Sequence, residues 1–470
     1  MSYTLKDESS ISSFAPSGFD VNLLRKYNVP GPRYTSYPTA LAFSEDVDRQ
    51  QLLHDLKQSG EANTPLSLYF HLPFCQSACW FCGCTRIITR NPRAADRYLD
   101  SLEKEIELTR PHLGEERRVV QMHFGGGTPT FFTPDQVERL GELIHNAFAF
   151  APGAETSVEV DPRRIEREHV RAWSALGCGR ASLGVQDNTP RVQQAINRIQ
   201  PKEVTAQVVQ WLREEGFRSI NIDLIYGLPF QTVATFEKTL DEILELEPDR
   251  LAVFSYAHVP WSKPAQKLLD RQGGLPEASV KLAILERVAE RLADAGYVYI
   301  GMDHFAKLGD ELATAQENGT LQRNFQGYST KAGTEILGFG MSAISQTPNG
   351  YRQNHKEMRP YQDALEKGDL PWNRGYILTE EDHRRRDTIH RLMCDLRLDF
   401  TRQSDRLGID FEKHYAAEIA ALAGLEKDGL LTRAQNGIEV TPAGRFLIRN
   451  IAMTFDAYLD RSTSRYSKTV

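Results

Sequence analysis

Between about residues 65 and 300 the chain alternates short runs of β-forming residues with amphipathic helical segments. Six candidate strands lie at 66–70, 119–124, 156–160, 180–185, 219–224 and 251–255. The segment 95–110, between the first two, places one apolar helical face at the i, i+3, i+4, i+7 spacing, formed by Tyr98, Leu99, Leu102 and Ile106. Six β–α units in series predict a parallel sheet with right-handed crossovers, either an open doubly wound sheet or a barrel.

Polar or glycine-rich segments follow all six candidate strands. Cysteines follow the first strand, and the later strand ends carry GGGTP (125–129), EVDP (159–162), GVQD (184–187), DLIYG (223–227) and YAH (256–258). In parallel α/β folds the loops after the strands converge on one mouth, where chemistry is assembled. We therefore expect one functional site at the carboxyl ends of the strands.

Four of the six cysteines lie within ten residues of one another: Cys75, Cys79, Cys82 and Cys84. Cys178 and Cys394 stand alone in apolar segments, and we expect both to be buried. The first residues lack the basic and apolar regions of a secretory signal, and no apolar run approaches the roughly 18 residues of a membrane span. We therefore expect a cytoplasmic protein, in which clustered thiols indicate a metal site rather than disulfides.

The cysteine spacing, Cys-x3-Cys-x2-Cys followed by x-Cys, favours an iron–sulfur cluster. Structural zinc usually takes two Cys or His pairs that stand well apart in the chain, whereas all these thiols share one tight loop. Three thiolates on a four-iron cluster would leave one iron open to a small molecule. A zinc site and a cluster that only transfers electrons remain alternatives.

We expect the chain to divide into a strap (1–50), a barrel with an extension that carries the site (51–365) and a helical cap domain (366–470). In the last, helices are expected at 379–397, 411–427 and 442–459, with a hairpin turn at Asn436-Gly437. This order resembles a winged helix, but residues 371–470 hold 16 Lys and Arg against 15 Asp and Glu. Because that balance and the net charge of −7 lack a basic footprint, we expect a structural cap and no nucleic-acid partner.

The cysteine loop, with Phe81 before its third cysteine, is similar to the signature of radical S-adenosylmethionine enzymes. Within that superfamily the chain resembles the oxygen-independent coproporphyrinogen III oxidases, through GPRYTSYPTA (31–40), YFHLPFC (69–75), GGGTP, EVDP, GVQD, DLIYGLP (223–229), GMDHF (301–305) and RNFQGY (323–328). The resemblance implies a partial (β/α)6 TIM-like barrel with an N-terminal strap and a winged-helix-like C-terminal domain. The related haem chaperones generally lack the strap and the cysteine at position 84, and both are present here.

The resemblance also implies roles for individual residues. Cys75, Cys79 and Cys82 would bind a [4Fe-4S] cluster. One S-adenosylmethionine would contact Tyr69, Gly126, Glu159 and Ile344. A second would contact Phe81, Gly127, Thr128, Gln186, Arg198, Asp223 and Ala257. Cys84, which would not be a cluster ligand, Phe325 and Gln326 match family positions implicated in function. His71, one strand repeat from Tyr69 and near the cluster, could tune the cluster or move protons, and these four residues are the catalytic candidates.

Several of these residues also have ordinary structural explanations. His71 could be a hydrogen-bonded core histidine, Gly126 a turn glycine and Glu159 part of a surface salt bridge. Arg198 would pair with the methionine carboxylate of the second cofactor molecule and Asp223 with its ammonium, although a lone arginine is usually solvated. Gly126 is suited to a ligand because backbone without a Cβ can approach closely.

The implied reaction is the oxidative decarboxylation of coproporphyrinogen III to protoporphyrinogen IX, in which a 5′-deoxyadenosyl radical attacks the propionates of rings A and B. Such an oxidoreductase of porphyrin biosynthesis needs an electron donor and an electron acceptor, and we expect a monomer without membrane insertion. Arg33 in the strap is a candidate anchor for the substrate carboxylates. A haem carrier and a purely electron-transferring protein are the alternatives.

Overall fold

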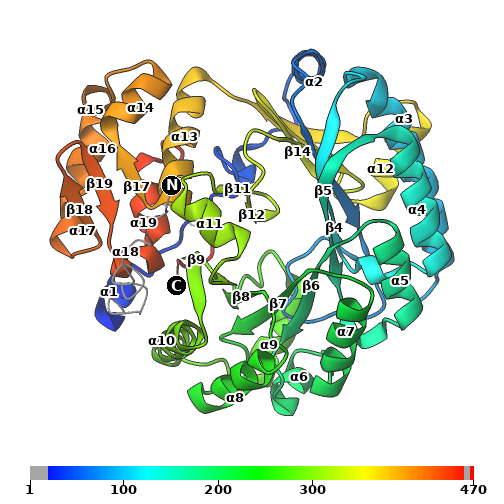
Figure 1. The fold of residues 1–470 in the computed structure, drawn as a ribbon, viewed down its shortest axis with the longest axis horizontal. Coiled ribbons are helices and arrows are strands. Elements are labelled where there is room, and N and C mark those ends of the chain that lie inside the picture. Colours follow the sequence, from blue (N-terminus) through cyan, green and yellow to red (C-terminus); the bar gives the residue numbers. More distant parts are fainter. Residues whose placement is uncertain (1–19, 460–465, 470) are drawn as a thin grey trace, which may run out of the picture.

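The computed structural model describes residues 20–459 and 466–469. Its centre is a twelve-stranded sheet in the order β16-β15-β14-β13-β1-β4-β5-β6-β7-β8-β10-β9, which curves through the molecule in Figure 1. The six predicted strands are confirmed, and neighbours in the series pair in parallel. They are β1 (Leu66–Leu72), β4 (Arg118–Gly126), β5 (Ala149–Val160), β6 (Arg180–Gln186), β7 (Ser219–Tyr226) and β8 (Arg250–Ser255).

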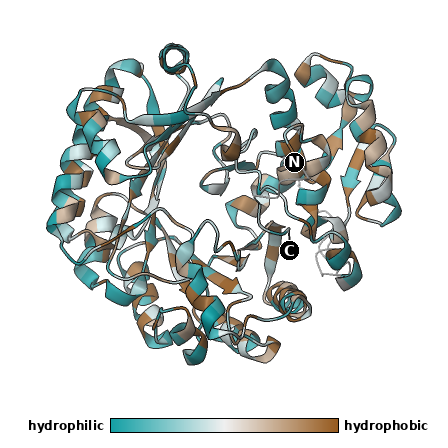
Figure 2. Ribbon diagram, turned by 180° about the vertical axis from the view of Figure 1, so that it is seen from behind, coloured by the Kyte–Doolittle hydropathy of each residue, from teal (hydrophilic) through white to brown (hydrophobic). Residues whose placement is uncertain are grey.

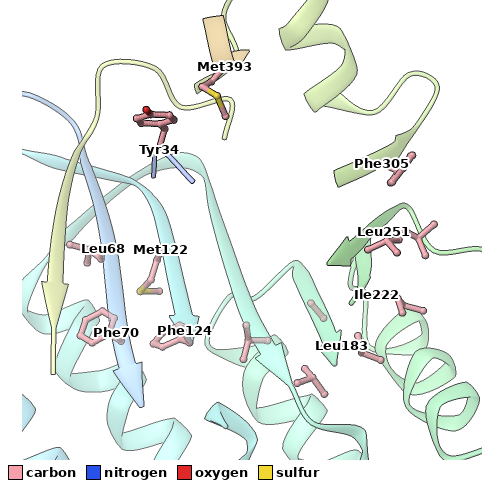
Figure 3. Close-up of a cluster of buried hydrophobic side chains, with 14 of the residues drawn as sticks. Tyr34, Leu68, Phe70, Met122, Phe124, Leu183, Ile222, Leu251, Phe305 and Met393 are labelled. Carbon is pink, nitrogen blue, oxygen red and sulfur yellow. The ribbon is translucent and has the colours of Figure 1, made fainter. Parts of the chain in front are cut away.

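Helices cover the outer face of this parallel series (Figure 1). They are α3 (Arg93–Thr109), α4 (Pro134–Ala147), α5 (Arg167–Ala175), α6 (Pro190–Ala195), α7 (Lys202–Glu214) and α8 (Val233–Leu244). The face predicted for α3 is buried, and α4 begins with a capping box between Thr133 and Gln136. Figure 3 shows Leu68 and Phe70 of β1 beside Met122 and Phe124 of β4, all fully buried.

The sheet continues beyond β1 in a part that the sequence pattern did not predict. Here β13 (Glu335–Phe339) is parallel to β1, and β14 (Ile344–Thr347), β15 (Gly350–Asn354) and β16 (Trp372–Ile377) follow as antiparallel neighbours. Every residue of β15 is buried, including the three consecutive polar residues Arg352, Gln353 and Asn354. The strand therefore lacks the alternation of polar and apolar residues by which a strand is predicted. Pairing in the large sheet thus continues past residue 366, where the cap domain was expected to begin.

A buried ion pair joins the two parts of the sheet. Arg117, just before β4, donates from Nη2 to Oε2 of Glu335 in β13 at 2.8 Å, and the two side chains are only 1% and 5% exposed. Ser59 of α2 (Arg49–Glu61) donates to the same carboxylate and accepts from Nη1 of Arg117 at 2.9 Å. Breaking a buried pair costs about 3–5 kcal/mol, so this contact helps to fix β13 and β4 on opposite sides of β1.

At the other edge of the sheet lie β9 (Tyr297–Gly301) and β10 (His304–Lys307), and a separate hairpin is formed by β11 (Gln322–Asn324) and β12 (Gly327–Ser329). The remaining helices of this half are α9 (Lys267–Gln272), α10 (Ala278–Asp294), α11 (Glu311–Glu317) and α12 (Met358–Glu366). Much of the outward helix surface is hydrophilic (Figure 2). No helix in the described part of the chain is long and apolar enough to cross a membrane.

The C-terminal unit has the predicted winged-helix-like order. It comprises α13 (Glu380–Asp395), β17 (Arg397–Asp399), α14 (Phe400–Leu407), α15 (Phe411–His414), α16 (Ala416–Ala421), α17 (Ala423–Lys427), β18 (Leu431–Ala434), β19 (Gly437–Val440), α18 (Pro442–Phe446) and α19 (Ile448–Ala452). The expectation of one helix over 411–427 was wrong, because the backbone leaves the helical region at Tyr415 (φ −106°, ψ 29°). The last predicted helix is likewise interrupted at Leu447 (φ −112°, ψ 21°) and ends well before residue 459.

The strap connects the large sheet to the C-terminal unit. Its described part begins at Asp20 and α1 (Val21–Lys26), and residues 1–19 lie outside the described residues. The Tyr34 hydroxyl donates to Asp456 at 2.9 Å, and the Tyr37 carbonyl accepts from the Tyr351 hydroxyl of β15 at 3.1 Å. The expected strap is therefore an ordered part of the fold from residue 20 onward.

Candidate active site at the carboxyl ends of the strands

The cysteine loop follows β1 and is held at its base by a short parallel pair, β2 (Phe74–Cys75) and β3 (Ile87–Ile88). Cys75 and Cys79 are buried, Cys82 is half-buried and Cys84 is exposed. The Cys75 Sγ lies 3.3 Å from Oγ1 of Thr128, after β4, and the Cys79 Sγ accepts from Arg163 and Arg198 at 3.6 Å each. Segments that follow different strands thus meet at the thiols, as the strand ends predicted.

The donor set of this loop fits an anionic iron–sulfur cluster. Hydrogen bonding from Cys84, with nearby Arg86, lowers the pKa of Cys82 below its usual value, which favours the thiolate. Burial raises the pKa of Cys75 to about 11. Among the described residues no three His, Cys, Asp or Glu side chains form a site for a single metal ion. Three thiols on one loop, facing guanidinium groups, suit a larger anionic sulfur-bound group.

His71 is a fully hydrogen-bonded core histidine. Its Nε2 lies 2.9 Å from the carbonyl of Thr85, so Nε2 donates, and Nδ1 accepts from the Tyr69 hydroxyl at 3.1 Å. Burial lowers its pKa, which keeps the ring neutral. Because Thr85 follows Cys84 directly, His71 attaches the far side of the cysteine loop to β1.

Gly125 and Gly126 end β4 and Gly127 follows it, and all three make room for protein atoms. Gly126 has φ +118°, and a Cβ on it would lie 2.9 Å from the His71 ring. A Cβ on Gly127 would lie 2.4 Å from the Pro73 carbonyl oxygen, and one on Gly125 would lie 2.9 Å from Oε1 of Glu159. The sequence attributed Gly126 to close approach of a ligand, but the space at its Cα is filled by His71.

Glu159, at the end of β5, connects two of the residues expected at the first cofactor molecule. Its Oε2 accepts from the Gly126 N–H at 3.1 Å, and its Oε1 lies 3.5 Å from Nε2 of His123, whose ring stacks on Tyr69. Burial alone would raise the pKa of Glu159, but these contacts outweigh it and lower the pKa. Ile344 begins β14, and its carbonyl packs against Gly338, which pairs with Tyr69. Tyr69, Gly126 and Glu159 therefore lie on the adjacent strands β1, β4 and β5, and Ile344 lies on β14, on the other side of β13.

Asp223 and Arg198, both expected at the second cofactor molecule, differ in how far their side chains are free to bind a ligand. Asp223 accepts from Ser182 at 3.2 Å and Asn221 at 2.7 Å, and burial, with repulsion from Glu159, raises its pKa to about 7. Arg198 follows α6 rather than lying on a helix. It is buried and bonds both Asp161 oxygens, at 3.2 and 3.4 Å, so its guanidinium already has a carboxylate partner.

Gln186 closes β6 in the left-handed region, at φ +75°, and is buried.

Gln266 is a site residue that the sequence did not reveal. It is 1% exposed, and its Nε2 donates to the carbonyls of Phe81 at 3.0 Å and Ala257 at 3.1 Å. Its Oε1 accepts from the Val259 N–H at 2.6 Å. The side chain thus joins the cysteine loop to the segment after β8. An isolated glutamine in SKPAQK gives no sequence signal.

The β11–β12 turn brings Gln326 to the site and Phe325 to its flank. Gln326 lines a cavity of about 230 Å³ inside the barrel, together with His123, Glu159 and Asp223. Phe325 packs edge-on against Tyr351 of β15. Arg33, the sequence candidate for a substrate anchor, forms an ion pair with Asp303 and lies over the Phe254 ring at 5.7 Å. Arg33 is therefore not a free cation.

A parallel partial barrel with a three-cysteine loop after its first strand defines a radical S-adenosylmethionine protein, and residues 69–243 match the Radical SAM superfamily model. Residues 378–447 match the HemN C-terminal domain. The chain belongs to the oxygen-independent coproporphyrinogen III oxidase family. It is 49% identical to the family member from Salmonella typhimurium over 94% of this chain and 96% of that protein, and 44% identical to that from Synechocystis over 97% and 98%.

A solved structure gives the same result. Coproporphyrinogen III oxidase from Escherichia coli, described as a radical SAM enzyme, superposes with a TM-score of 0.89 at 46% identity, covering 94% of this chain and 99% of that one. The expected family and fold class are therefore confirmed.

Proposed function

We propose that this chain catalyses the oxygen-independent oxidative decarboxylation of coproporphyrinogen III to protoporphyrinogen IX. The observation that carries the proposal is the three-cysteine loop at the carboxyl ends of the strands, where Cys75 contacts Thr128 and Cys79 contacts Arg163 and Arg198, in a chain of this family. When bound, the cluster and S-adenosylmethionine supply a 5′-deoxyadenosyl radical, which removes one β-hydrogen from a propionate. Loss of CO2 and of one electron to an acceptor then leaves a vinyl group, once on ring A and once on ring B.

The chain's own residues would hold and orient these groups. Cys75, Cys79 and Cys82 would ligate the cluster, while His71 holds the loop that carries them. Glu159 and Asp223 offer carboxylates to ammonium or ribose hydroxyl groups. Cys84 donates to Cys82 and stays a non-ligand thiol at the mouth. Confinement within the barrel keeps water from the reacting carbon, which is the protein's main contribution to radical chemistry.

We propose two S-adenosylmethionine molecules side by side at the mouth. One would lie over β14, β1, β4 and β5, against Tyr69, Gly126, Glu159 and Ile344. The other would lie toward β6, β7 and β8, against Phe81, Gly127, Thr128, Gln186, Asp223 and Ala257. The order of the strands supports this arrangement, since Gln186, Asp223 and Ala257 lie on or after β6, β7 and β8, away from Tyr69 on β1 and Ile344 on β14. The two residue sets adjoin at the end of β4, where Gly127 and Thr128 follow Gly126. Arg198 would act indirectly, by holding Asp161 beside Cys79.

We further propose a cytoplasmic monomer that takes electrons from a separate donor and passes them to a separate acceptor. Its parts would be the strap, the barrel with its antiparallel extension, and a C-terminal cap that begins after β16.

Anaerobic turnover tests the function directly. The reconstituted protein, given coproporphyrinogen III, S-adenosylmethionine and a reductant, should form products with vinyl groups that chromatography resolves. A preparation with an intact cluster that binds haem stoichiometrically but yields no vinyl product would instead be a haem carrier.

A further inference from the structure

A second cavity, of about 510 Å³, lies between the strap, β11 and α13. The strap contributes the segment 34–37, β11 contributes its whole length, and α13 contributes one face. In Figure 1 the β11–β12 hairpin stands between the C-terminal unit and the large sheet. The two sides of this hairpin face different cavities: Arg323 and Asn324 line the second cavity, whereas Gln326 and Tyr328 line the cavity inside the barrel.

Cations dominate the lining of the second cavity. It contains Arg323, Lys331, Arg384, Arg386, Arg391 and Arg406, against only two acidic residues, Glu380 and Asp387. Those acids are used, because Glu380 pairs with Arg384 and Asp387 with Arg406 at 2.9 Å, while Arg391 pairs with Asp395 at 2.8 Å. Within residues 20–459 and 466–469, Arg323, Lys331 and Arg386 have no ion-pair partner at all.

Two of these three cations also have buried donors with no hydrogen-bond partner in the described structure. Arg323 is 5% exposed, and its Nη1 is unsatisfied although its Nε donates to the Arg33 carbonyl and its guanidinium lies 4.7 Å over the Tyr328 ring. Arg386 donates from Nη2 to the Pro348 carbonyl at 3.2 Å, and its Nη1 is unsatisfied. Buried guanidinium donors without a partner are costly, so two such arginines beside one cavity indicate an anionic ligand.

The charges that line the barrel cavity indicate which anionic ligand the second cavity binds. Glu159 and Asp223 line that cavity with carboxylates suited to the ammonium groups of the cofactor. The two arginines in its lining, Arg180 and Arg250, already pair with acidic residues and are not free to bind a propionate. Coproporphyrinogen carries four propionates, of which two keep their carboxyl groups. With Arg33 paired to Asp303, the cations available to those carboxylates lie across the hairpin.

We propose that the second cavity binds carboxylates, and that these are the two propionates that the porphyrinogen retains through the reaction. This inference rests on the proposed function. Arg386 and Arg323 are the principal donors and Lys331 adds long-range attraction. The hairpin that carries Gln326 then lies between the anchored end of the substrate and its reacting end.

The test is porphyrin binding to the holoenzyme, measured by fluorescence titration with coproporphyrin III and with protoporphyrin IX. Arg386→Gln and Arg323→Gln should each lower the binding affinity for both porphyrins by about tenfold or more, which is the effect of losing one charge-assisted contact. Both should be affected because both porphyrins contain the retained propionates. Lys331→Gln provides a variant on a loop, away from the α13 packing. Arg359→Gln, on α12 with a side chain 92% exposed, is the matched control and should change nothing.

Three outcomes would overturn the proposal. Unchanged porphyrin affinity in Arg386→Gln and Arg323→Gln would remove the substrate from this cavity. A loss of affinity for coproporphyrin III alone would mean that the second cavity binds the reacting propionates instead. Binding of inorganic phosphate that depends on Arg386, with porphyrin affinity unchanged, would assign the cavity to a small anion. Failure of the proposed function would look different, because the unaltered enzyme would then form no vinyl product.

Discussion

At the scale of single residues, the side chains of the site are mostly hydrogen-bonded to other residues of the same chain, which leaves few groups free to bind a ligand. His71 satisfies both ring nitrogens within the protein, and Arg198 uses its guanidinium on Asp161. Gly126 is glycine because His71 lies where a Cβ would be. The residues with capacity left for a ligand are the thiols and the carboxylates of Glu159 and Asp223, and these are the groups that a cationic cofactor and a cluster require.

Gly126→Ala tests this packing. A Cβ at φ +118° is strained, and it would also collide with the His71 ring, so we expect a loss of stability of about 2 kcal/mol or more. Gly153→Ala is the matched control, since Gly153 also has positive φ (+73°) but has open space at its Cα, and it should lose only about 1 kcal/mol. Chemical unfolding of both variants would measure this. Equal losses would show that backbone conformation alone requires Gly126.

Asp223 predicts a pH dependence for cofactor binding. Because burial and Glu159 raise its pKa to about 7, the carboxyl is mostly protonated at pH 6 and mostly ionised at pH 7.5. If the ionised form binds the ammonium, the affinity for S-adenosylmethionine should rise about eightfold over that interval. Asp223→Asn should bind more weakly and without this rise. Calorimetric titration at several pH values measures both, and an equal rise in the Asn variant would assign the titration to another group.

At the scale of elements, the site depends on connections between segments that follow different strands. Gln266 is the clearest case, since one buried amide bonds the cysteine loop at Phe81 and the post-β8 segment at Ala257 and Val259. The β11–β12 hairpin is another, because it borders both cavities.

Gln266→Met should keep the fold and the bound iron but weaken S-adenosylmethionine binding by about tenfold, because two carbonyls lose their donor and the segments separate. Gln210→Met, on the exposed face of α7, is the control and should bind normally. Iron content and equilibrium dialysis with labelled S-adenosylmethionine provide the readouts. Normal binding by Gln266→Met would reduce Gln266 to a packing residue.

At the scale of the whole molecule, the local sequence pattern predicted the parallel strands and the helices between them. The six parallel strands and their helices carry clear periodicity, and the polar strand ends correctly indicated one mouth. The strands β13–β16 could not be predicted, since β15 buries Arg352, Gln353 and Asn354 through long-range partners. Contacts between distant segments also could not be predicted from sequence spacing. They include the ion pairs of Arg33 with Asp303 and of Arg198 with Asp161, and the hydrogen bonds of Gln266.

The central claim is that a radical generated at the cysteine loop removes hydrogen from the substrate propionates. The most direct measurement uses coproporphyrinogen III deuterated at the β-carbons of its propionates, in anaerobic turnover with unlabelled S-adenosylmethionine and a reductant. The account predicts deuterium in 5′-deoxyadenosine and two molecules of 5′-deoxyadenosine for each protoporphyrinogen IX formed. Vinyl product accompanied by unlabelled 5′-deoxyadenosine would contradict it.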